Sequence, residues 1–347
     1  MRKTIIFMAC LCGFFPGPSV RAADPVDGNG DSEIRLYGRG DFDITQSRRA
    51  SGPPVITSDL WKGSRVGLKG RGYLGAGWAA IVHVESGFGT ENGEFLLMQD
   101  KVFGRQAYLG LESRLGTVTF GRQYPVSDAV AGIVDIALPG ILSPYKSQFY
   151  WQFDRLEKAL LYSSPAVNGF QARAGYAFGE KAGQPGSSTM TAGILYHKDR
   201  LEAGVSLESW ETSAFSNSSA VYNFWNLAAS YDLGPVLLVA GFSSDDLNLD
   251  LSSNSAVVSR TCALGAKIPA TAAGQVVILL QAVKPETGKT MEIATIRYTY
   301  SLFKGTDLYS QINVASKAAA AAYGVRSELF IGMVFRFDLP LWKRKPV

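Results

Sequence analysis

The segment IRLYGRGDFDI (residues 34–44) separates its apolar and polar side chains by phase along the chain. Successive side chains of a β-strand point to opposite faces, so a period of two predicts a strand with one apolar and one polar face. Ile34, Leu36, Phe42 and Ile44 share one phase, and Arg35, Tyr37, Arg39, Asp41 and Asp43 share the other. Such a strand suits a boundary between an apolar and a polar medium.

The same pattern recurs along the chain, broken by clusters of Gly, Asn, Asp, Ser and Pro that are typical of turns. Residues 34–337 without the long insert 125–154 leave about 17 residues for each strand and its connection, which suits membrane strands of ~9–11 residues. Tight and long connections alternate, and we interpret the run 318–322 as an outer loop in preference to a helical turn. Sixteen strands are predicted to begin near residues 33, 61, 76, 100, 115, 155, 169, 189, 200, 221, 235, 256, 275, 290, 305 and 326.

The amino terminus has the pattern of a secretory signal peptide over residues 1–23. Arg2 and Lys3 precede an apolar stretch, and small residues near Ala23 offer a cleavage site; acylation at Cys10 is a minor alternative. Cleavage removes three of the 34 Lys and Arg, leaving 31 against 30 Asp and Glu, or +1, so no strong field attracts nucleic acid. Cys262 then stands alone, and the mature chain cannot close an internal disulfide.

Composition argues against catalysis and metal binding. The chain has two His, three Cys and no spacing that suits zinc. His83 with Glu85 could form the base of a barrel hydrolase, but no Gly-x-Ser-x-Gly turn accompanies them, so a plain interior histidine is preferred. We therefore expect no enzyme activity, no cofactor and no metal. No apolar run approaches the ~18 residues of a membrane-spanning helix, and export without disulfides favours a transmembrane barrel over a soluble sandwich.

Five strings in order along the chain resemble the Gram-negative general porins, particularly their beta-proteobacterial branch. They are LYGRGD (36–41), GSRVGLKG (63–70), FGRQAYLGL (103–111), GTVTFGRQY (116–124) and YSLFKGTDLYSQ (300–311). The resemblance implies an outer-membrane homotrimer, each subunit a 16-stranded antiparallel transmembrane β-barrel whose third external loop folds inward. The barrel would span residues 24–337, and residues 338–347 would form a basic tail that departs from the family pattern.

The resemblance also implies a pore constriction with a basic ladder on the wall. Arg39, Arg65, Arg105 and Arg155 match it. Phase supports the first two, whereas Arg105 is mixed because Leu109 shares its phase. Glu85 shares its phase with His83, which suggests that both face the lumen.

The constriction loop is expected at residues 125–154, with Asp135 as the acid opposite the arginines. Gly140 stands where enteric relatives have a second acid, so Asp128 or Asp154 would supply that charge, or no residue would. Fewer acids than arginines lead to the hypothesis of anion preference.

Arg122 shares the outward phase of Val118 and Phe120. Two interpretations stay open: a subunit interface where a carboxylate of another subunit neutralises it, or a strand end where its guanidinium reaches the membrane surface.

The sequence therefore predicts a general diffusion porin for small hydrophilic solutes and ions, set in outer-membrane lipid and not binding nucleic acid. The alternatives are a substrate-selective channel and a non-conducting barrel adhesin or structural barrel.

Overall fold

The computed structural model describes residues 31–49, 55–57, 63–90, 93–95, 101–137, 155–179, 188–212, 220–250 and 255–344. The predicted signal peptide lies outside these residues. In the described part, two helices accompany the strands, α1 (Val126–Val134) and α3 (Lys317–Tyr323), and neither is long and apolar enough to cross a bilayer. The strands are β1 (Ser32–Arg49), β2 (Val55–Thr57), β3 (Ser64–Gly75), β4 (Trp78–Phe88), β5 (Gln106–Ser113), β6 (Gly116–Gln123), β7 (Leu156–Ser163), β8 (Phe170–Ala177), β9 (Thr189–Lys198), β10 (Leu201–Thr212), β11 (Ala220–Asp232), β12 (Leu237–Asp250), β13 (Ser255–Pro269), β14 (Gly274–Pro285), β15 (Met291–Phe303), β16 (Thr306–Ala315) and β17 (Val325–Arg344).

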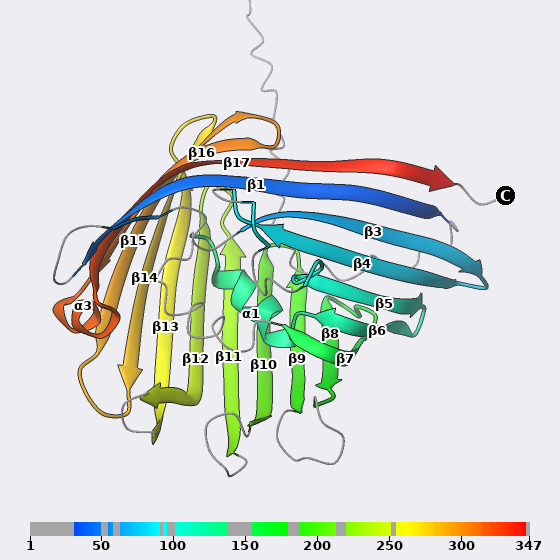
Figure 1. The fold of residues 1–347 in the computed structure, drawn as a ribbon, viewed down its shortest axis with the longest axis horizontal. Helices are drawn as coiled ribbons and strands as arrows, with labels where there is room; N and C mark the ends of the chain where they lie inside the picture. Colours follow the sequence, from blue (N-terminus) through cyan, green and yellow to red (C-terminus); the bar gives the residue numbers. More distant parts are fainter. Residues whose placement is uncertain are drawn as a thin grey trace, which may run out of the picture.

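The strands form one closed antiparallel barrel (Figure 1). Each strand from β3 to β17 pairs with the next, and β1 pairs with both β3 and β17, which closes a ring of 16 strands. The short β2 pairs with β1 from Val55 to Thr57. Because a closed ring leaves no strand without neighbours, the backbone groups find partners inside the barrel. The predicted fold class is confirmed.

The predicted strand starts lie within three residues of the observed ones, except the fourth. That strand was expected near residue 100 and begins at Gln106. Residues 101–105 precede it as turn and irregular backbone. The chain forms ladder pairs with β4 only from Gln106 onward.

The two phases of each strand lie in different environments. On β1, Ile44 is 63% exposed on the outer surface, whereas the adjacent Thr45 is fully buried inside. On β17, Leu329, Ile331, Met333 and Phe335 are exposed while Glu328 and Phe330 are buried. An apolar outer band with a polar interior is the arrangement of a barrel in a lipid bilayer.

Helix α1 lies inside the barrel on the wall formed by β9–β12 (Figure 1). Val130 and Val134 are buried against Ala228 and Val239, which replace polar residues on the inner face there. The apolar contact explains why this part of the wall departs from the polar interior. Residues 138–154 of the predicted constriction loop, including Asp154 and Gly140, lie outside the described residues.

The first turn of α1 is fixed to the wall by hydrogen bonds. The first N–H groups of a helix have no partner within it. Val126 N donates to Thr191 Oγ1 at 3.0 Å, and Ser127 N donates to Glu208 Oε1 at 3.2 Å. The Ser127 hydroxyl also donates to Glu208, and Asn226 Nδ2 donates to Ser127 O at 3.1 Å. The wall therefore sets the position of the helix start.

Two expectations about the carboxyl-terminal part were wrong. Residues 317–323 form α3, because Ser316 caps the helix by accepting from Ala319 N at 3.3 Å and Gly324 ends it in the left-handed conformation. The tail predicted after Phe337 is largely strand, since β17 continues to Arg344, which pairs with Ser32.

We expect Glu208→Ala to loosen α1 without unfolding the barrel. The substitution removes the acceptor of two Ser127 donors, and leaving buried donors unpaired costs about 1–3 kcal/mol. Limited proteolysis should then cleave within residues 125–137 faster, while heat-modifiable migration stays that of a folded barrel. Glu211→Ala is the matched control, because this glutamate of β10 is exposed and accepts from Ser188. Equal proteolysis of both variants would contradict the anchoring role.

Candidate functional site

Three arginines stand directly opposite one another on the inner face of neighbouring strands. In the antiparallel register Arg39 of β1 is paired with Arg336 of β17 on one side and with Arg65 of β3 on the other. Cross-strand partners of like charge destabilise a sheet. The side chains of Arg39, Arg65 and Arg336 therefore form a row whose charges need compensation from other groups.

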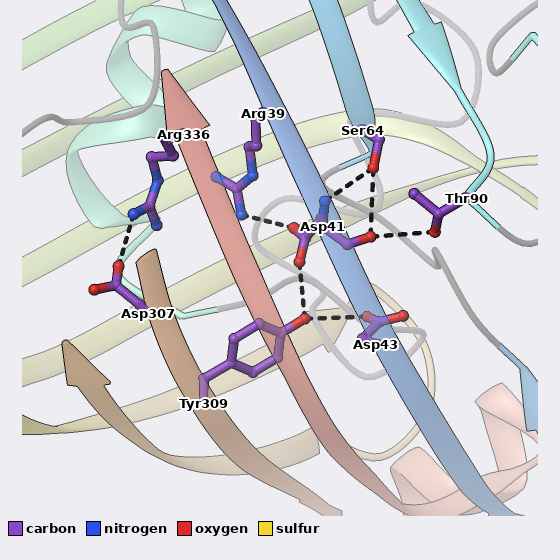
Figure 2. A network of polar contacts seen from close by, with 8 residues as sticks. All are labelled: Arg39, Asp41, Asp43, Ser64, Thr90, Asp307, Tyr309 and Arg336. Atoms are coloured by element: carbon purple, nitrogen blue, oxygen red, sulfur yellow. Dashed lines mark hydrogen bonds and ion pairs between the residues drawn. The ribbon is translucent and has the colours of Figure 1, made fainter. Parts of the chain in front are cut away.

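Carboxylates on the same walls compensate two members of this row. Arg39 donates to Asp41 Oδ2 at 2.7 Å, and Arg336 donates to Asp307 Oδ2 at 2.6 Å (Figure 2). Arg39 and Asp41 are two residues apart and share a face of β1, as the phase of the sequence predicts.

Asp41 is held by three further groups that fix its carboxylate and backbone. Tyr309 of β16 donates to Asp41 Oδ1 at 2.9 Å and lies 3.4 Å from Asp43 Oδ2. Asp41 N donates to Ser64 Oγ at 2.9 Å, and Thr90 Oγ1 donates to Asp41 O at 3.3 Å (Figure 2). The network joins β1, β3 and β16, so the position of Arg39 depends on the closure of the barrel.

A second group continues the basic surface along the wall from Arg65. Arg105, directly before β5, donates from Nε to Glu85 Oε1 at 2.7 Å and from Nη2 to Tyr124 Oη at 2.9 Å. Arg155, directly before β7, donates to the same Tyr124 oxygen at 2.5 Å and stacks on its ring at 4.5 Å. Tyr124 therefore fixes two arginines at once, one through each lone pair of its oxygen.

A chain of hydrogen bonds behind Glu85 gives each donor an acceptor. Tyr37 donates to Glu85 Oε2 at 2.7 Å, so its oxygen accepts from His83 Nε2, 2.5 Å away. His83 Nδ1 then accepts from Tyr108, 3.1 Å away. The tautomer follows from these partners. His83 is an interior histidine whose two ring nitrogens both bind tyrosines.

The acidic residues of α1 lie across the barrel from the arginines. In the ring of 16, β1 and β10 are eight strands apart, and α1 packs on β10 and β11. Asp128 lies in the first turn of α1, and Asp135 caps its end. The structure therefore places the basic wall and the helix with its two acids on opposite sides of the interior.

Arg122 points outward from β6 and binds groups of its own chain. It donates to Gly104 O at 2.7 Å and to Glu157 Oε1 of β7 at 2.6 Å, and Lys101 also pairs with Glu157. A β-bulge lies between β6 and β7 at this point, and Lys158 has a positive φ of 49°. Glu157 of the same chain thus pairs with both Arg122 and Lys101.

Sequence reasoning identified part of this site. The structure brings Arg39, Arg65, Arg105, Arg155 and Glu85 to one side of the interior. Sequence reasoning missed Tyr124 and Tyr309. The phase of a tyrosine along its own strand does not show which residue of a distant strand it will bind through a hydrogen bond. Sequence reasoning also missed Arg336, although its phase on β17, opposite to Phe335, gave the signal. No group of three metal-ligating side chains occurs among the described residues.

A closed barrel with an apolar outer band, charged inner walls and an inward helix defines a transmembrane channel protein. The family model described as Gram-negative porin matches residues 9–317, so the chain belongs to the Gram-negative porin family. The protein is a general diffusion channel of the bacterial outer membrane.

Similar proteins span almost the whole chain. An outer membrane porin protein of Bordetella pertussis is 25% identical and aligns over 97% of this chain and 100% of its own length. Outer membrane porin protein 32 of Delftia acidovorans is 25% identical over 76% of this chain and 78% of its own. Among solved structures, an anion-selective porin from Comamonas acidovorans superposes with a TM-score of 0.72 at 21% identity, covering 88% of this chain and 100% of its own. OmpF of Salmonella typhi gives 0.69 at 14% identity, covering 88% and 98%.

We expect Tyr124→Phe to release Arg105 and Arg155 from their common acceptor while keeping the ring on which Arg155 stacks. The two guanidinium groups would then move more freely, and single-channel recordings in a planar bilayer should show greater open-channel current noise. Tyr162→Phe is the control, because that tyrosine is exposed and donates to Leu115 O. Noise equal to that of the wild type would remove Tyr124 from its positioning role.

Proposed function

We propose that the arginine wall makes this channel prefer anions at its narrowest part. The observation that supports the proposal is the register that sets Arg336, Arg39 and Arg65 directly opposite one another. Such a row is unfavourable in a sheet, and a mobile anion in the lumen relieves its repulsion. Arg105 and Arg155 extend the same wall, and guanidinium groups keep their charge at any working pH.

Among the described residues, few acids lie opposite the wall. Asp128 and Asp135 are the acidic side chains of α1 and its cap. Asp41, Asp307 and Glu85 lie on the arginine side and each pairs with one arginine. Small hydrophilic solutes and ions would then pass between a basic wall and a weakly acidic helix, and the transverse field would orient water and dipolar solutes. The structural neighbour from Comamonas acidovorans is an anion-selective porin, which agrees with this proposal.

We expect the reversal potential measured in a KCl gradient across a planar bilayer to have the sign that a channel more permeable to chloride than to potassium produces. Arg65→Gln should reduce the chloride-to-potassium permeability ratio about fivefold, because one charge at ~4 Å in water changes an ion's energy by about 1 kcal/mol. The matched control is Arg71→Gln, on the same strand and phase but paired with Glu112. Potassium preference of the wild type would overturn the proposal.

We further propose that the channel is a homotrimer that uses the outer face around β6 and β7. The group of Arg122, Lys101 and Glu157 supports this location, because its two cations share one carboxylate and an outward charge costs ~2–4 kcal/mol at the lipid midplane. A carboxylate of a neighbouring subunit would offset the remaining positive charge.

We expect the unheated, detergent-extracted protein to have three times the mass of one chain in analytical ultracentrifugation, after correction for bound detergent. A cysteine introduced at Phe120, which is exposed on this face, should form crosslinks between subunits, whereas one at Ile296 on β15 should not. A monomer mass would contradict the trimer.

A further inference from the structure

A second group of cations adjoins the row of Arg336, Arg39 and Arg65 on the side away from Arg105 and Arg155, and it shares Arg336 with that row. It consists of Lys267 of β13, Arg297 of β15 and Arg336 of β17, here called the exit cluster. Lys267 lies two residues before the end of β13 at Pro269, and Arg336 N donates to Gly305 O in the tight turn between β15 and β16. The exit cluster therefore lies toward the rim that carries the short turns, which in bacterial barrels faces the periplasm.

The members of the exit cluster are close enough to act on one another. Lys267 and Arg297 are both paired with Val277 of β14, so their backbones are two strand spacings, about 10 Å, apart. The charges of Arg297 and Arg336 both act on Lys267, opposed by that of Asp307, and those of Arg39 and Arg336 act on Arg297, opposed by that of Asp41. Long basic side chains from these positions reach a common volume.

Carboxylates compensate only part of the positive charge of the exit cluster, and Arg297 is the member without an ion pair among the described residues. Arg336 pairs with Asp307, and Arg39 pairs with Asp41. No described carboxylate lies within ion-pair distance of Arg297, whose Nε has no hydrogen-bond partner although the residue is only 9% exposed. An uncompensated charge in such a place is costly.

Tyr309 accounts for why Arg297 has no acidic partner of its own. The Tyr309 hydroxyl donates to Asp41, while its ring lies 5.0 Å from the Arg297 guanidinium. The ring of Tyr309 therefore contacts the guanidinium group of Arg297, while its hydroxyl group binds the nearest carboxylate, that of Asp41. A cation–π contact stabilises the guanidinium but leaves its N–H donors unused.

We propose that the exit cluster binds a small oxyanion, a carboxylate or a phosphate, as it leaves the constriction toward the short-turn rim. The proposal rests on the proposed anion preference of the channel. The guanidinium fork of Arg297 matches two oxygens of such a group, and Lys267 adds a third donor and a compact charge. A site in series with the constriction lets an anion pass from one set of cations to the next, provided that each holds it weakly.

The test measures block of chloride current by inorganic phosphate in planar bilayers, with phosphate added to one side at a time. Arg297→Gln and Lys267→Gln should each raise the half-blocking phosphate concentration about tenfold, the effect of one charge-assisted hydrogen bond. Arg297→Lys keeps the charge and should restore part of the block. Arg260→Gln is the control, because this arginine is exposed on the outer phase of β13, and it should leave the block unchanged.

The outcomes separate the exit cluster from the constriction. Loss of phosphate block in Arg297→Gln together with a retained chloride preference in KCl supports the exit cluster. Wild-type block in both variants, or no block of the wild-type channel at all, overturns it. Potassium preference of the wild type in KCl overturns the proposed function instead. Heat-modifiable migration verifies folding of each variant, and Lys267→Gln gives the same test if Arg297→Gln does not fold.

Discussion

The double pairing of β1, with β17 on one side and β3 on the other, is the interaction on which the rest of the molecule depends. In hydrocarbon an unpaired N–H or C=O group has no water to bind, so a sheet is stable there only as a closed ring. The residues that close the ring also carry charge, because Arg39 lies between Arg336 and Arg65 in that register. A shift of one residue would turn Arg39 toward lipid. Closure and the basic wall are therefore set by the same hydrogen bonds.

Compensation within the basic wall follows a simple geometric rule. Acids two residues along the same strand, as in Arg39 and Asp41, share a face with their partner. Acids on a neighbouring strand, as in Glu85 and Arg105, reach across. Tyrosines then connect these pairs: Tyr309 binds Asp41, Tyr37 binds Glu85, and Tyr124 joins Arg105 to Arg155. The phenols add hydrogen bonds without adding charge, so they hold the arginines while leaving the wall positive.

The fold and the inner positions of Arg39 and Arg65 could be predicted from phase, whereas Arg105 and Arg155 were assigned from the family resemblance. A period of two needs no tertiary information, which is why the inner position of Arg39 and the outer position of Ile44 follow from the sequence. Arg105 had mixed phase because it precedes β5 and reaches the interior from a turn, where alternation has no meaning. The bulge at Lys158 depends on a backbone conformation that composition does not specify. Helix α3 was missed because its cap at Ser316 was not weighed against the low complexity of the alanine run.

The length of β17 has a consequence for association with other chains. Its pairing with β16 ends at Phe335, whereas its pairing with β1 continues to Arg344. Beyond Arg336, whose N–H still donates to Gly305 O, the strand therefore has one edge without a described neighbour, and its exposed apolar residues include Leu339 and Trp342. Pro340 offers no N–H to an incoming strand, and Lys343 and Arg344 repel a second copy. The overhang is thus protected against edge-to-edge aggregation while the newly made chain is still outside the membrane.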